Sequence, residues 1–174
     1  MNTTTATSAL KSFAIFRSDR PGARPLALLW TTEADPSATI ARLALGAMIL
    51  PHGLQKVFGW FGGYGLGATL SAFTETLGIP WVLALAAILS ESVGGLALLL
   101  GLGGRLAALA VGTVMVVAAL TQHVQNGFFM NWAGTLPAGT EGFEFHLLAV
   151  ALAAVVVLRG SGALSLDRVL TRRS

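Results

Sequence analysis

The 174-residue sequence contains no cysteine, and only 11% of its residues are charged. Without cysteine the chain cannot form disulfides, thiolate metal sites or a CxxC redox motif, so any redox chemistry must use an external group. A typical soluble domain carries about 25% charged residues, whereas here 54% of the residues are hydrophobic and the mean hydropathy is +0.72. This composition excludes an ordinary water-soluble domain and indicates a membrane protein.

The small excess of basic residues does not indicate a nucleic-acid-binding protein. Eleven Lys and Arg residues against eight Asp and Glu residues give a formal net charge of +3. A nucleic-acid-binding protein gathers such charges in a patch or stripe, but here they flank hydrophobic segments. The expected partner is therefore the lipid bilayer, with no nucleic acid.

Four hydrophobic segments follow one another, and each ends at a Gly, Pro or polar cluster. They cover residues 40–60, 80–103, 105–123 and 143–159. Because a transmembrane helix needs about 20 apolar residues, the sequence predicts an all-α integral membrane protein with four transmembrane helices in an up-down bundle, the last of them short. The predicted organisation is a Ser/Thr-rich cytoplasmic extension, the membrane domain and a basic tail, at residues 1–37, 38–170 and 171–174.

The basic residues predict the orientation, because positively charged flanks stay in the cytoplasm. All of them except Lys56 lie on one side of the predicted bundle: Lys11, Arg17, Arg20, Arg24, Arg42, Arg105, Arg159, Arg168, Arg172 and Arg173. Both termini are therefore predicted to be cytoplasmic. The arginines at the helix ends are expected to extend to lipid headgroups; they are Arg42, Arg105 and Arg159.

Two features predict how the helices are connected and packed. In the connection between the first two spans, apolar residues recur at helical spacing, which predicts a short helix on the membrane surface or capping the bundle; they are Leu66, Leu70, Phe73 and Leu77. Small residues four apart predict close packing of the second span against the third; these pairs are Ser90 with Gly94 and Ala108 with Gly112.

Ionisable side chains fall within the predicted spans, where each is costly unless paired or hydrated; they are His52, Lys56, Glu91, His123, Glu144 and His146. Lys56 follows Arg42 by fourteen residues, and Glu91 precedes Arg105 by fourteen, so both lie roughly 21 Å from the cytoplasmic side. These two charges are predicted to meet. His52 lies on the same helix face as Lys56, and the preceding Pro51 is expected to disrupt the helix.

Together these groups predict a polar pocket in the outer half of the bundle. Hydrogen-bond donors beside aromatic walls suit a quinone, with Gln55, Trp60, Phe128 and Phe129 completing the set. Two alternatives stay open: a metal site at the His and Glu residues, and a bis-His haem between the first and fourth spans. Both are less favoured than a quinone, because no span carries a metal-binding motif. Equally, the Lys56–Glu91 pair could serve only to hold two helices together.

Three stretches resemble the motifs of the DoxX family of small bacterial membrane proteins. They are Pro51-His-Gly-Leu-Gln-Lys-Val-Phe-Gly59, Glu91-Ser-Val-Gly-Gly95 continuing to Arg105-Leu-Ala-Ala, and Gly162-Ala-Leu-Ser-Leu-Asp167. The resemblance covers residues 40–170 and implies a four-helix transmembrane bundle in the bacterial inner membrane. Residues 1–37 have no counterpart in the usual short family N-terminus.

The family is named for a subunit associated with a thiosulfate:quinone oxidoreductase and quinol oxidase, so the resemblance implies a quinone-linked redox or oxidative-stress role as an accessory subunit. His52, Lys56 and Glu91 match its motifs and are the predicted catalytic residues. The predicted cofactor-binding residues are Gln55, Trp60, His123, Phe128, Glu144 and His146, with no metal ligand. Whether the protein is itself an enzyme, and whether it forms a homo-oligomer, are left open.

Two other functions fit the sequence. One is a non-enzymatic scaffold that recruits an oxidoreductase. The other is a small-solute transporter, which ranks last because the chain lacks an inverted repeat and paired broken helices.

Overall fold

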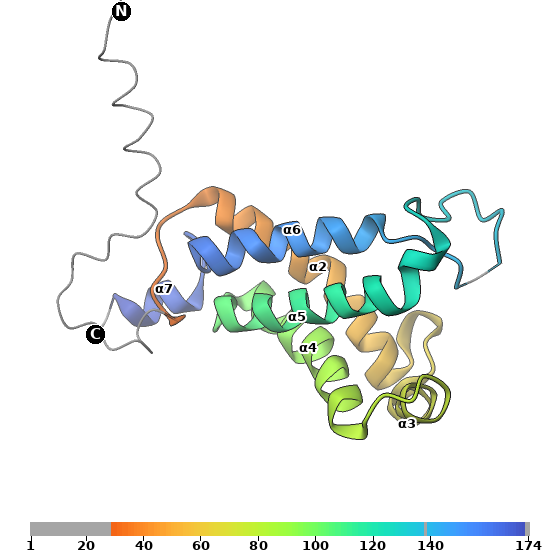
Figure 1. The fold of residues 1–174 in the computed structure, drawn as a ribbon. Helices are drawn as coiled ribbons and strands as arrows, with labels where there is room; N and C mark the ends of the chain where they lie inside the picture. Colours follow the sequence, from red (N-terminus) through yellow and green to blue (C-terminus); the bar gives the residue numbers. More distant parts are fainter. Residues whose placement is uncertain (1–28, 138, 173–174) are drawn as a thin grey trace, which may run out of the picture.

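The computed structural model describes residues 29–137 and 139–172, and every regular element in these ranges is a helix (Figure 1). Four helices form the bundle: α2 (Pro36–Phe58), α4 (Trp81–Leu100), α5 (Gly104–Ala118) and α6 (Glu144–Arg159). The predictions for the N-terminal extension up to residue 28 and for the last two residues lie outside the described residues.

Shorter helical segments join and extend these four. They are a 3₁₀ turn (Trp60–Gly62), α3 (Gly65–Ser71) with a π-helical turn (Ala72–Thr76), a π-helical turn (Ala119–His123) and a 3₁₀ turn (Val124–Asn126) after α5, and α7 (Leu166–Thr171). The helix predicted in the first connection is therefore confirmed, and it ends in a wider π turn. Pro51 does not interrupt α2, which stays helical from end to end.

Within residues 29–137 and 139–172, three helices are long and apolar enough to cross a membrane: Pro36–Phe58, Trp81–Leu100 and Gly104–Asn126. Their ends lie close to those of the first three predicted segments, because glycine, proline and capping residues stop the helices there. At the start of α2, for example, the Asp35 carboxylate accepts a hydrogen bond from the Ser37 amide at 2.8 Å. Helix α6, with 16 residues, is shorter than the roughly 20 residues of an average span.

The four main helices pack as two pairs. The most extensive contacts join α2 to α4 and α5 to α6, and Figure 1 shows the α2–α4 pair diverging from the α5–α6 pair toward α3. Where the pairs still touch, apolar side chains of α2, α5 and α6 fill the core, among them Leu45, Ile49, Val111 and Val156. We call the end of the bundle with α3 and the loop after α5 the loop end, and the end with α7 the base.

Glycines explain why α2 and α4 lie so close together. A Cβ atom on Gly53 would stand 2.4 Å from the Ser92 Cα atom, and one on Gly95 would stand 3.0 Å from the Leu50 Cα atom. Gly94, predicted to bring the second and third spans together, would meet Val111 of α5 at an ordinary 3.4 Å. The closest backbone approach among these positions is thus between α2 and α4.

The base is closed by charged residues that are fully buried. Arg42 has no exposed surface, and its guanidinium donates to backbone carbonyls at the end of α4 and in the segment after α6; the acceptors are Leu98, Leu99, Ser161 and Leu164. The prediction that Arg42 reaches lipid headgroups is therefore wrong. Its charge instead satisfies carbonyls that a helix end leaves without partners.

The C-terminal segment completes this base. Asp167 is 2% exposed and accepts hydrogen bonds from the Gly103 amide at 2.8 Å, the Gly104 amide at 3.1 Å and the Ser161 hydroxyl at 2.5 Å. It thereby caps the first orphan amides of α5. The segment after α6 is therefore part of the fold, since its Ser161 and Asp167 are buried.

The other two helix-end arginines also have protein partners. Arg105 donates to the carbonyls of Val157, Leu158 and Thr31. The Arg159 side chain is half-exposed and lies 3.7 Å from the Asp35 carboxylate. Hydrogen bonds from Ser37, chiefly from its hydroxyl, hold the pKa of Asp35 below its ordinary value.

Candidate functional site

The Lys56 ammonium and the Glu91 carboxylate form an ion pair between α2 and α4, as the helix-rise arithmetic predicted. Glu91 is 4% exposed, and the Lys56 side chain is 23% exposed. Gly53, one turn before Lys56, lets α2 approach the backbone of Glu91 and Ser92. The His-Gly and Gln-Lys parts of the motif thus act together, because the glycine permits the approach that brings the lysine to the glutamate.

His52 lies between this ion pair and the opposite helix pair. Its ring meets the Phe145 ring of α6 edge-on, with centroids 5.6 Å apart. It interacts electrostatically with Lys56 and Glu91 on one side and with His146 on the other. His52 is nevertheless exposed, so the point at which the two helix pairs diverge is open at this residue.

His123 and His146 form a second cluster, between α5 and α6. Their ring centroids are 4.2 Å apart, and Nδ1 of His123 lies 2.8 Å from the Glu141 carbonyl of the preceding loop. His146 is 7% exposed, and among the described residues its Nδ1 atom has no hydrogen-bond partner. A buried polar atom without a partner costs free energy, so His146 is the least satisfied polar side chain of the site.

Two further predicted binding residues, Gln55 and Glu144, form hydrogen bonds with nearby loop groups. The Gln55 amide donates to the Phe61 carbonyl at 3.2 Å. The Glu144 carboxylate accepts from the Met130 amide at 3.2 Å and the Trp132 indole at 3.4 Å.

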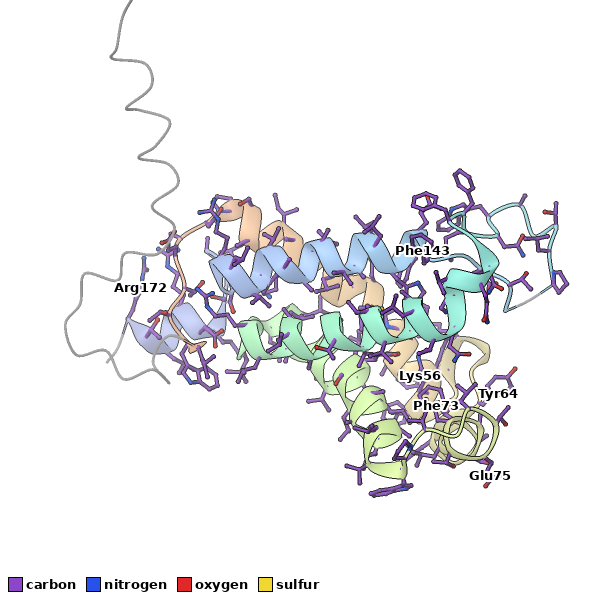
Figure 2. The ribbon with its side chains drawn as sticks, in the orientation of Figure 1. Lys56, Tyr64, Phe73, Glu75, Phe143 and Arg172 are labelled. Carbon is purple, nitrogen blue, oxygen red and sulfur yellow. The ribbon has the colours of Figure 1, made fainter. Side chains whose placement is uncertain are left out.

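The predicted aromatic walls are spread over the surface of the loop end. Trp60 is 56% exposed; its ring lies tilted against Phe58 and meets Phe61 edge-on. Phe128 meets Phe129 and Phe143 edge-on. Figure 2 shows Phe143 at the start of α6 and Arg172 at the opposite end of the bundle. The structure thus brings together five of the six predicted ionisable groups, His52, Lys56, Glu91, His123 and His146. It leaves the predicted aromatic residues at the periphery.

One residue that links the clusters was missed by the sequence analysis. Phe145 contacts both His52 and His146, the latter with ring centroids 5.5 Å apart. Its position between Glu144 and His146 could have indicated a place in the site. However, an apolar residue in a hydrophobic segment does not by itself indicate a functional role.

Two cavities are lined by none of the residues of these polar clusters. One, of about 370 Å³, is a groove along α5 and α6, and the other, of about 420 Å³, lies at the base beside Trp30 and Leu170. Over residues 29–137 and 139–172, no three His, Asp or Glu side chains are grouped so that they could hold a metal ion.

These features define a class: an all-helical membrane protein in which polar side chains from several apolar helices converge near one end. The family comparison is more specific. The DoxX family model matches residues 37–124, so the chain belongs to the DoxX family, as its motifs indicated. The match covers α2 through the π-helical turn after α5 and stops before α6. No curated protein and no solved structure matches the chain.

Proposed function

We propose that this DoxX-family protein is a quinone-binding subunit of a membrane redox system, with its site at the loop end of the bundle. In this proposal α6 is the fourth span, both termini lie in the cytoplasm, the membrane is the bacterial inner membrane, and electrons come from a partner oxidoreductase. Such a partner is needed because the chain has neither cysteine nor a dinucleotide-binding or haem-attachment motif.

The observation that carries the proposal is the buried Nδ1 atom of His146, which has no partner among the described residues. An imidazole nitrogen can donate a hydrogen bond to a quinone carbonyl or accept one from a quinol hydroxyl, depending on its tautomer. Such a contact would remove the cost of leaving this atom unpaired. His123, in ring contact and bonded to the loop carbonyl of Glu141, supports a route for protons toward the loop.

The Lys56–Glu91 pair supports the same site from the other side. A quinone takes up two protons when it is reduced by two electrons, and Lys56, Glu91 and His52 are proton-exchanging groups beside the histidine cluster. The exposure of His52 at the divergence of the helix pairs supports entry of a lipid-soluble ligand from the side.

Binding of decylubiquinone to the full-length chain in lipid nanodiscs tests the proposal. We expect saturable binding that His146→Phe weakens at least tenfold. Leu147→Phe, a substitution at the neighbouring exposed position of α6, should bind as the wild type does. Wild-type affinity in His146→Phe, or in a His52→Ala, Glu91→Gln double variant, would show that the site is assigned wrongly.

A second candidate function is a scaffold that recruits an oxidoreductase, and the specific observation in its favour is the α2–α4 contact at Gly53 and the ion pair. On this alternative the charges only fix helix packing. Replacing a buried ion pair by apolar residues of similar volume is often neutral or stabilising. A Lys56→Met, Glu91→Leu variant should then keep its partner in co-purification, and the wild type should bind no quinone.

A further inference from the structure

The groove along α5 and α6 has the composition of a hydrocarbon-binding site. Its volume is about 370 Å³, within the range of about 300–1,000 Å³ that ligand pockets take. Small and branched apolar residues line it, including Gly112, Val116, Val150 and Ala154. The hydroxyl of Thr113, its one polar side chain, already donates to the Leu109 carbonyl at 2.8 Å.

One end of the groove approaches the histidine cluster. Val150 follows His146 by one helical turn, and Ala153 and Val157 follow at seven and eleven residues, so all four lie on one stripe of α6. Val150, Ala153 and Val157 line the groove. His146 continues this stripe toward the loop end, and it carries the buried atom without a partner.

We infer that the α5–α6 groove binds the isoprenoid tail of a quinone whose head group contacts His146. This inference rests on the proposed function and adds a subsite to it. An elongated apolar chain ending in a polar ring suits an apolar groove that has His146, with its unpaired imidazole nitrogen, one helical turn beyond Val150. A transmembrane helix of a partner fits less well, because its backbone groups are already bonded within the helix and leave His146 without a partner.

The test separates the tail from the head group. In nanodiscs, with the quinone counted as its mole fraction in the lipid, we expect decylubiquinone to bind the wild type at least tenfold more tightly than ubiquinone-0, which has the same ring without the tail. Ala154→Phe fills the groove from its exposed rim. It should weaken decylubiquinone binding at least tenfold and leave ubiquinone-0 binding unchanged.

Ala151→Phe is the matched control, because Ala151 is an exposed alanine of the same helix outside the groove, and it should bind both quinones as the wild type does. Unchanged decylubiquinone binding in Ala154→Phe would overturn the inference, as would an equal loss for both quinones. Displacement by a phospholipid with ten-carbon chains at an equal mole fraction would instead assign the groove to ordinary lipid. If the wild type binds neither quinone, the proposed function itself fails.

Discussion

The base and the loop end of this bundle both bury charged or titratable groups, but they satisfy them to different degrees. At the base, Arg42 donates to four carbonyls and Asp167 accepts from three donors. At the loop end, Lys56 and Glu91 pair with each other, while His146 keeps an unbonded nitrogen among the described residues. A fully bonded network rigidifies a fold, whereas an incompletely bonded one leaves capacity for a ligand.

The difference teaches where to look for function in a membrane protein of this kind. An ionisable residue within a span is a functional candidate by default, and by that rule Arg42 and His146 rank alike. Their hydrogen bonds distinguish them: Arg42 donates to backbone carbonyls of its own chain, whereas the Nδ1 atom of His146 has no partner among the described residues. Replacing Arg42 and replacing His146 by an apolar residue should therefore change stability in opposite directions.

The largest expected effect is at the base, in Arg42→Met. The substitution removes the shared donor of four carbonyls and leaves buried acceptors without partners, at a cost on the order of 3–5 kcal/mol. We expect most of the protein to be lost from the monodisperse peak in size-exclusion chromatography of detergent extracts, with a lower midpoint of thermal unfolding. The control is Arg172→Met. Arg172 is an exposed arginine near the C-terminal end, and none of the hydrogen bonds described above joins its side chain to the bundle. Equal yields for the two variants would show that the buried network does not hold the base together.

A smaller loss is expected in Gly53→Ala, where α2 crosses α4. The new methyl group would collide with the Ser92 backbone at 2.4 Å, so the helices must separate, which typically costs about 1–3 kcal/mol. Gly67→Ala is the matched control, because a Cβ atom there meets nothing within 4 Å and alanine favours an exposed helix by up to about 1 kcal/mol. Unfolding midpoints should fall for the first variant and hold or rise for the second. If both variants behave alike, close approach at Gly53 is not what brings Lys56 to Glu91.

The sequence was sufficient to predict the helices and the ion pair, and the reasons are physical. Long apolar runs bounded by glycine and proline define the spans, and a rise of about 1.5 Å per residue places Lys56 and Glu91 at matching depth. That arithmetic gives depth along a helix but not the neighbour that each face meets. Gly95, for example, faces Leu50 of α2, a neighbour that the spacing of small residues does not identify.

The base could not be predicted for a related reason. Most of its hydrogen bonds join residues more than fifty positions apart, such as Arg42 to Ser161 and Asp167 to Gly103. An arginine at a helix end and a short amphipathic tail are both common at a membrane surface, and neither pattern indicates that the tail folds back under the bundle. Phe145 was missed likewise, because ring contacts between helices leave no trace in hydrophobic periodicity.

The smallest expected effect has the opposite sign and lies at the loop end. His146→Phe keeps an aromatic ring between His123 and Phe145 but removes the buried nitrogen that has no partner among the described residues. Since an unsatisfied buried polar atom costs about 1–3 kcal/mol and the new ring fits imperfectly, we expect a net gain of about 1 kcal/mol, measured as a higher unfolding midpoint in detergent. His123→Phe, which loses the contact with the Glu141 carbonyl, should show no gain. A destabilised His146→Phe would mean that the nitrogen has a partner in the membrane, and the contrast between the two ends would then rest on the ion pair alone.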